Sequence, residues 1–223
     1  RQMCIRDRGN NEDVNDYAKV EITDPSICPR YTARAVKNVK IGPSPQWIQR
    51  RLTACGLRSI NNIVDITNYI MLEYGQPMHA YDLDNIEGKK IIVRDASDGE
   101  MLETLDEQPR ELKSGMITIA DEKRAIGVAG VMGGANTEVT DNTTTILFES
   151  ANFNPILVRR GAKSLGMRTD ASALFEKGLD SENCLNAINR ACELIEEMGA
   201  GEVIGGCIDI YPTKKTKTVL PFE

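Results

Sequence analysis

One histidine leads the list of residues that could carry chemistry. His79 is the only histidine of the 223 residues, and imidazole changes its charge closest to neutral pH. It follows Pro77, and Asp82, three residues later, has a carboxylate that could orient the ring. A histidine after a proline turn is more often structural than catalytic, so both interpretations stay open. The chain has no GxSxG motif, which argues against a serine-triad hydrolase.

Glu149 is a second candidate. It follows the apolar run Ile146-Leu147-Phe148, so we expect it to end a buried strand over Thr144–Glu149. A carboxylate is costly to bury unless it is paired or hydrogen-bonded. Glu149 is therefore either solvated at a strand end, or it points into a pocket and accepts a hydrogen bond from a ligand hydroxyl or amine.

A glycine-rich run, GVAGVMGG, covers positions 127–134. Glycine permits a close approach of backbone to a ligand. The dinucleotide-binding pattern GxGxxG is absent, and a polar loop follows where that motif requires a helix. Two interpretations remain. The run is either a strand packed tightly against a helix, or a pocket wall made of backbone.

A basic segment covers residues 159–177 of this acidic chain. Its positively charged residues are Arg159, Arg160, Lys163, Arg168 and Lys177. They form either a solvated helix face or a surface that meets a phosphate backbone. Within the segment, Thr169–Ser172 is predicted to be a turn or helix cap with the small residue Ala171 inside it.

A helix before His79 must position these groups. Ile63, Ile66 and Ile70 recur at helical spacing. Asn61 or Asn62 can cap the start of the helix, and glycine at position 75 ends it before the proline turn. Asn68 falls in the middle of this helix, where its propensity is poor, which indicates that another interaction holds it there.

The remaining elements mix strands and helices without regular βαβ alternation. This pattern predicts an α+β fold with mixed sheets and packed helices in a single compact domain. We expect that domain to cover residues 17–212. Residues 1–16 show no periodicity and are expected to be a disordered or non-native leader, and residues 213–223 a linker to a missing next domain.

Composition narrows the possible functions. A net charge of −6 and a pI of about 5.1 argue against strong nucleic-acid binding by this chain alone. Six cysteines without a CxxC pair, beside one histidine, argue against a zinc site. No apolar run approaches the ~20 residues of a membrane helix. We expect a cytoplasmic protein with free thiols and no metal at its site.

Three segments in order resemble one family. NNIVDITNYIMLEYGQPMHAYD, IGVAGVMGGANTEVTDNTTTILFESANF and RRGAKSLGMRTDASALFEKGLD are similar to the editing domain of the beta subunit of bacterial phenylalanyl-tRNA synthetase (phenylalanine–tRNA ligase). The likeness runs from about Asp24 to Glu223. It implies hydrolysis of tyrosine that has been mistakenly attached to tRNA(Phe), because an apolar synthetic pocket rejects an added hydroxyl only weakly.

The resemblance also implies roles for single residues. Glu149 matches the carboxylate that recognises the tyrosine hydroxyl, and His79 the site histidine. Thr67 and Asn68 match the polar pair near the ester. The residues that match the amino-acid pocket are Gly130, Gly133 and Ala171. With a phosphate backbone as partner, Arg159, Arg160, Lys163 and Arg168 are the candidate RNA contacts.

The implied partners are the acceptor end of tRNA(Phe) and the synthetase alpha subunit, with no membrane and no DNA. No cofactor is implied in this domain, whereas ATP and magnesium would serve the whole enzyme. Two alternatives stay open. One is a non-catalytic tRNA-docking or structural module of the same subunit, and a weaker one is a nucleotide-binding enzyme.

Overall fold

Strand β10 (Ile146–Asn152) is buried along its whole length and has other strands on both sides. In the computed structural model, which describes residues 9–212 and 214, its sheet has the order β11–β2–β10–β3, and β12 also pairs with β2. We call this the central sheet, and all its pairings are antiparallel. Its other strands are β2 (Arg30–Lys37), β3 (Met78–Asp82), β11 (Glu202–Val203) and β12 (Ile208–Ile210).

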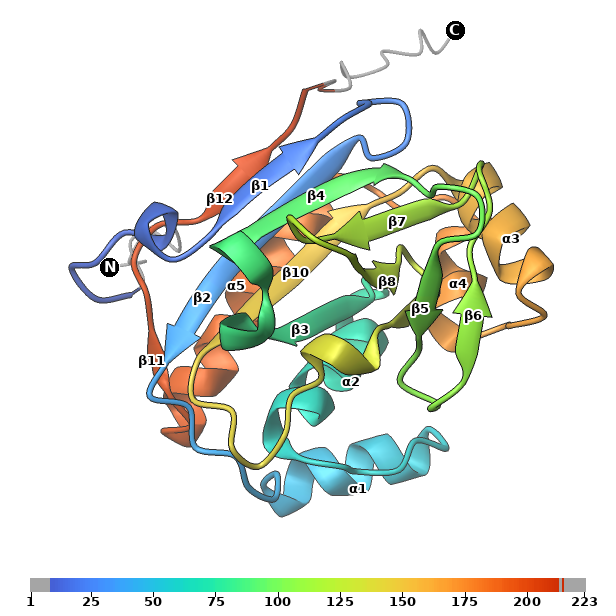
Figure 1. Cartoon of the computed structure of the whole chain (residues 1–223). Coiled ribbons are helices and arrows are strands. Elements are labelled where there is room, and N and C mark those ends of the chain that lie inside the picture. Colours follow the sequence, from blue (N-terminus) through green and yellow to red (C-terminus); the bar gives the residue numbers. More distant parts are fainter. Residues whose placement is uncertain (1–8, 213, 215–223) are drawn as a thin grey trace, which may run out of the picture.

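Side chains alternate along β10 between two hydrophobic cores. Leu147 and Ala151 pack into the core on one face, and Ile146 and Phe148 into the core on the other. A sheet that is apolar on both faces must be covered on both, so the molecule has three layers with the central sheet in the middle (Figure 1).

A second sheet covers the face that carries Leu147 and Ala151. This outer sheet has the order β1–β4–β7–β8–β9, with β1 parallel to β4 and the other pairs antiparallel. A hairpin of β5 (Met101–Glu103) and β6 (Pro109–Glu111) lies beside it. The outer strands are β1 (Lys19–Ile22), β4 (Lys90–Asp95), β7 (Ile117–Ala120), β8 (Ala125–Val128) and β9 (Met132–Gly133).

Helices cover the opposite face of the central sheet. They are α1 (Gln46–Ala54), α2 (Asn62–Tyr74) and α5 (Asn183–Met198). Two more helices, α3 (Pro155–Ser164) and α4 (Asp170–Phe175), pack against each other, and α3 contacts β7 of the outer sheet (Figure 1). Single 3-10 turns are η2 (Val14–Asp16), η3 (Leu83–Asn85), η4 (Glu87–Lys89) and η5 (Ala135–Thr137). This architecture confirms the predicted α+β fold.

Helix α2 has the limits that its sequence predicts. The Asn61 side chain accepts hydrogen bonds from the backbone N–H groups of Ile63 and Val64, and Gly75 ends the helix with a φ of 67°. The chain then passes Pro77 and enters β3, a strand that the sequence did not predict. His79 is therefore held on a paired strand and not on a free turn.

The structure corrects the extent of the predicted leader. Val14 is fully buried in the core, and Asp13 forms an isolated bridge with Gly205. Asn10 donates its backbone N–H to the carbonyl of Val203. Residues 9–16 thus pack on the domain, and their single buried apolar side chain is too little to produce a periodic pattern.

Residues 1–8 of the predicted leader, and nearly all of the linker predicted for 213–223, lie outside the described residues. Across the part of the chain that the structure describes, no helix combines the length and the apolar character needed to cross a bilayer.

Candidate functional site

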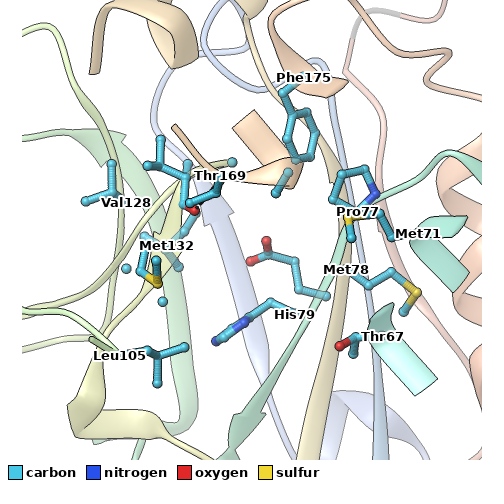
Figure 2. A pocket seen from close by; sticks show the side chains of 18 of the residues that line it. Thr67, Met71, Pro77, Met78, His79, Leu105, Val128, Met132, Thr169 and Phe175 are labelled. Carbon is cyan, nitrogen blue, oxygen red and sulfur yellow. Dashed lines mark hydrogen bonds between the residues drawn. The ribbon is translucent and has the colours of Figure 1, made fainter. Parts of the chain in front are cut away.

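A cavity of about 280 Å³ lies where β3 and β10 of the central sheet meet the outer sheet, α2 and α4 (Figure 2). The structure brings seven of the predicted site residues together around it. These are Thr67, Asn68, His79, Gly130, Gly133, Glu149 and Ala171. Most of the remaining wall is apolar. It includes Met71, Pro77, Met78, Leu105, Ile119, Val128, Val131, Met132 and Phe175.

Glu149 is a buried carboxylate in the middle of β10. It pairs with His79 of β3 on one side and with Ala33 of β2 on the other. The predicted strand end was wrong, because β10 continues to Asn152, and the solvated alternative was wrong, because Glu149 is only 6% exposed. Glu149 lines the cavity, as the pocket interpretation requires.

Two tyrosines hold the Glu149 carboxylate. The hydroxyls of Tyr31 and Tyr81 donate to its Oε2 atom over 2.6 and 2.7 Å. Burial raises the pKa of the Glu149 carboxyl, and these two hydrogen bonds offset part of that rise. Burial and the nearby carboxylate hold the pKa of both phenols well above the usual range, so both remain donors.

His79 lies beside this carboxylate on β3. Its ring meets the Tyr81 ring edge to face, with centroids 4.4 Å apart. Its Nε2 atom is buried and has no hydrogen-bond partner among the described residues. Burial lowers the pKa of His79 to about 4, so the imidazole is neutral near pH 7. His79 therefore offers an unused polar nitrogen to a ligand or a water.

The predicted contact between Asp82 and His79 was wrong. Residues three apart on a strand point to opposite faces. Asp82 instead accepts hydrogen bonds from the hydroxyl of Thr143 at 2.7 Å and from the backbone N–H of Asp84 at 3.0 Å.

The two glycines nominated for the pocket serve different purposes. A Cβ atom added at Gly133 would lie 2.7 Å from Nε2 of His79, so only glycine lets the ring approach this wall. Gly130 has a φ of 68°, and a Cβ atom there would lie 2.9 Å from Cδ2 of Phe175. Backbone lines the cavity at both positions, but Gly130 also allows tight packing against a helix, which was the alternative interpretation.

Helix α2 supplies the polar pair Thr67 and Asn68. The Thr67 hydroxyl donates to the carbonyl of Val64 at 2.8 Å, so its oxygen can serve a ligand or water only as an acceptor. The Asn68 carboxamide has no hydrogen bond with the described residues, and its amide remains available on the cavity side.

Helix α4 closes another side of the cavity. The Thr169 side chain caps the helix in a capping box with Ser172, and its hydroxyl also donates to the carbonyl of Val131 at 2.9 Å. Ala171 and Phe175, one turn apart, line the cavity. The other face of the same helix carries Ser172, which lines a separate surface hollow.

That hollow contains most of the predicted RNA contacts. The hollow has a volume of about 620 Å³, and its lining includes Arg159, Lys163 and Arg168. Arg160 lines an adjoining hollow together with Arg159 and Lys163. All four are exposed, and the Arg168 guanidinium lies 3.4 Å from Glu176. None of them lines the cavity of Glu149, because α4 stands between the two.

Sequence reasoning missed Tyr31 and Tyr81. Tyr31 belongs to β2 and Tyr81 to β3, and β3 was not predicted. Tyr31 precedes Glu149 by 118 positions and Tyr81 by 68, so no local pattern links them. It also missed Leu105, whose hairpin reaches the cavity through a hydrogen bond from its N–H to the carbonyl of Gly133.

The chemistry available in the cavity follows from these contacts. Its walls suit an apolar or aromatic group, and the Glu149 carboxylate suits a hydroxyl or amine carried by that group. His79, Thr67 and Asn68 can hold a water. Within residues 9–212 and 214, no cluster of three or more histidine, cysteine or acidic side chains could hold a metal ion.

Comparisons with known proteins give one family. A family model described as the B3/4 domain matches residues 27–200. The phenylalanine–tRNA ligase beta subunit of Geobacter sulfurreducens is 49% identical over 214 residues, which is 96% of this chain and 27% of that protein. The corresponding subunit of Carboxydothermus hydrogenoformans is 52% identical over 201 residues, 90% of this chain and 25% of that protein. The chain thus spans about a quarter of the length of these relatives.

A solved structure shares the fold. It is an N-terminal fragment of the phenylalanyl-tRNA synthetase beta subunit from Pyrococcus horikoshii. The match has a TM-score of 0.59 and covers 88% of this chain and 52% of that chain, at 13% sequence identity.

Proposed function

Because the chain belongs to the B3/4 domain family and is similar to one region of phenylalanine–tRNA ligase beta subunits, we propose that it is the editing domain of such a subunit. In this proposal it hydrolyses the ester between tyrosine and the terminal adenosine of tRNA(Phe). Editing is needed because the synthetic site must separate phenylalanine from tyrosine, which differs by one added hydroxyl.

The observation that carries this proposal is the buried carboxylate of Glu149 at an otherwise largely apolar cavity. Tyrosine would place its ring between the apolar walls and donate its hydroxyl to Glu149. Phenylalanine would bury the same carboxylate without that hydrogen bond, at a cost of about 1–3 kcal/mol. That difference selects tyrosine for hydrolysis by roughly 10- to 100-fold.

Hydrolysis itself requires a positioned water near the ester. Neutral His79 can bind that water through a ring nitrogen, while the Thr67 oxygen accepts a hydrogen bond from the water. A histidine whose pKa is about 4 is a weak base. His79 therefore orients the water in this proposal, and the ribose hydroxyl of the tRNA assists the proton transfer. No metal takes part in this step.

The tRNA would approach over α4. The hollow with Arg159, Lys163 and Arg168 lies on the far side of this helix from the cavity, so it can contact phosphates while the terminal adenosine carries tyrosine inward. The net charge of −6 opposes tRNA binding. The rest of the subunit and the alpha subunit would therefore supply most of the affinity, and ATP and magnesium would act at the synthetic site.

The test compares deacylation of Tyr-tRNA(Phe) and Phe-tRNA(Phe) by the complete enzyme that contains this sequence. We expect faster release of tyrosine. Glu149→Gln should reduce the tyrosine preference by about 10- to 100-fold. The matched control is Glu100→Gln, since Glu100 pairs with Arg94 outside the cavity and should not affect the preference. Equal release of both amino acids by the unaltered enzyme would contradict selective editing.

A second candidate function is a tRNA-docking module without hydrolysis. It is favoured by the weak basicity of the groups proposed to hold the water, since the His79 pKa is low and the Thr67 hydroxyl donates within its own helix. In that case the enzyme would bind Tyr-tRNA(Phe) without releasing tyrosine, and variants at Arg159 and Lys163 would alter only tRNA binding.

A further inference from the structure

Glu149 is bonded by two phenols that come from different strands. Tyr31 lies on β2 and Tyr81 on β3, which are the two neighbours of β10 in the central sheet. Both hydroxyls reach the same carboxylate oxygen, Oε2. Both tyrosine side chains are buried.

The strand register places the two rings on either side of the carboxylate. Tyr31 pairs with Ala151 and Tyr81 pairs with Leu147, which are two residues after and two residues before Glu149. Side chains two positions apart share a face, so all three functional groups point to the same side of the sheet. The carboxylate is therefore fixed from two diagonal directions.

We propose that Tyr31 and Tyr81 are positioning residues that set substrate specificity, an inference that rests on the editing function proposed above. They occupy Oε2 of Glu149 and leave Oε1 as the acceptor for the hydroxyl of the bound tyrosine. The substrate is then recognised as the third phenol on one carboxylate. Neither tyrosine touches the scissile ester, and both act through Glu149.

The hydrogen bonds also favour the charged form of the carboxyl. A buried carboxylate tends to take up a proton, and donors to its oxygens oppose this tendency. A hydrogen bond to an ionised acceptor is roughly twice as strong as a neutral one. Two phenol donors thus strengthen the contact that tyrosine makes and phenylalanine lacks.

Tyr31→Phe and Tyr81→Phe test this inference in the complete enzyme, because each keeps the ring and removes one hydroxyl. We expect each to lower the ratio of kcat/KM for Tyr-tRNA(Phe) over Phe-tRNA(Phe) by about 10-fold. The loss should lie in KM for Tyr-tRNA(Phe) with kcat unchanged, because the hydroxyl contact is equally strong before and during ester cleavage.

A pH profile gives a second readout. Without one of the two phenols, the Glu149 carboxyl takes up a proton at a higher pH. As the pH is lowered, KM for Tyr-tRNA(Phe) should therefore begin to rise at a higher pH in the variants than in the unaltered enzyme. A purely structural defect would lower the rates of both substrates and would not shift this profile.

Two comparisons isolate the role of Glu149. Tyr69→Phe is the matched control, because buried Tyr69 donates to Glu73 at 3.1 Å on α2, outside the cavity, and should leave selectivity unchanged. In a Glu149→Gln background, Tyr31→Phe and Tyr81→Phe should cause no further loss of selectivity, because residues that act through one group are not additive.

An enzyme that selects tyrosine but keeps its selectivity in both variants would overturn this inference and leave the editing function intact. An equal loss of selectivity from Tyr31→Phe or Tyr81→Phe with and without Glu149→Gln would also overturn it. Thermal unfolding identifies a variant that fails to fold, and the test then uses the variant at the other tyrosine. An unaltered enzyme without tyrosine selectivity would instead contradict the proposed function, before any variant is made.

Discussion

Burial shifts the pKa of two residues that line the cavity, Glu149 and His79. It raises the pKa of Glu149 and lowers that of His79, and in both cases it is the largest cause of the shift. An ion pair between them would shift both values in the opposite directions. Among the described residues, Glu149 and His79 form no ion pair and Nε2 of His79 has no hydrogen-bond partner, although their strands place them side by side. This leaves the carboxylate free to recognise a hydroxyl and the imidazole free to bind water.

The low pKa of His79 predicts a pH dependence of stability. The group has an ordinary pKa of 6.5 and a folded value of about 4. The contribution of neutral His79 to the free energy of unfolding is complete above pH 6.5 and is lost as the pH falls toward 4. The reason is that the unfolded chain binds the proton at a higher pH than the folded protein does. Between pH 7 and pH 5 the free energy of unfolding should fall by about 2 kcal/mol on this account.

Urea denaturation of the unaltered protein and of His79→Gln at both pH values measures this term. Glu149 titrates in the opposite sense, so only the difference between the two proteins reports on His79. An identical pH dependence in both proteins would show that His79 is not held neutral by burial.

At the level of elements, two short structures shape the cavity. The glycine run forms β8, a tight turn and β9, and its backbone makes one wall. Helix α4 makes another wall and separates the cavity from the basic hollow. The hydrogen bond from the Thr169 hydroxyl to the carbonyl of Val131 joins these two walls. Changes in either element should therefore alter the cavity without disturbing the central sheet.

Gly133→Ala should displace the His79 ring. Its new methyl group would lie 2.5 Å from Cε1 of His79, which is too close for contact. We expect a loss of stability of about 1–3 kcal/mol and slower deacylation. Gly161→Ala is the matched control, because Gly161 lies in α3 outside the cavity lining and the nearest atom to its added methyl group would be 3.8 Å away. Denaturation and deacylation of both variants check this, and equal effects would argue against the contact with His79.

Ala171→Leu should fill part of the cavity and exclude the tyrosine ring. We expect deacylation of Tyr-tRNA(Phe) to fall by more than about 10-fold, since a displaced substrate loses its alignment with the ester. Ala173→Leu, in the same helix but outside the cavity lining, is the control and should retain activity. Undiminished activity of Ala171→Leu, with the fold verified by circular dichroism, would show that the substrate does not use this part of the cavity.

At the scale of the whole molecule, charge is distributed unevenly. The chain has a net charge of −6, yet Arg159, Arg160, Lys163 and Arg168 gather on and just after α3. The chain also spans only about a quarter of its relatives. A local basic surface on an acidic fragment can orient a nucleic acid but cannot hold it strongly alone.

Charge reversal at Arg159 and Lys163 tests this orientation. In the complete enzyme, Arg159→Glu with Lys163→Glu should raise KM for Tyr-tRNA(Phe). It should also reduce the slope of log affinity against log salt by about 1.5, because two phosphate contacts are lost. Lys40→Glu with Lys123→Glu changes the net charge equally at exposed sites outside both hollows and should have little effect. Equal effects of the two pairs would indicate a general charge effect without a local phosphate contact.

The sequence by itself determined the features that depend on neighbouring residues. Asn61 and Gly75 set the limits of α2, since capping and a left-handed C-terminus are local. The three long motifs predicted the family, and they contain the seven predicted site residues that line the cavity. Only the tertiary structure placed His79 on a strand, paired it with Glu149 and brought in the hydroxyls of Tyr31 and Tyr81. Pairing between strands joins residues that are far apart in the chain, and no periodicity within one segment records which strands will pair or in what register.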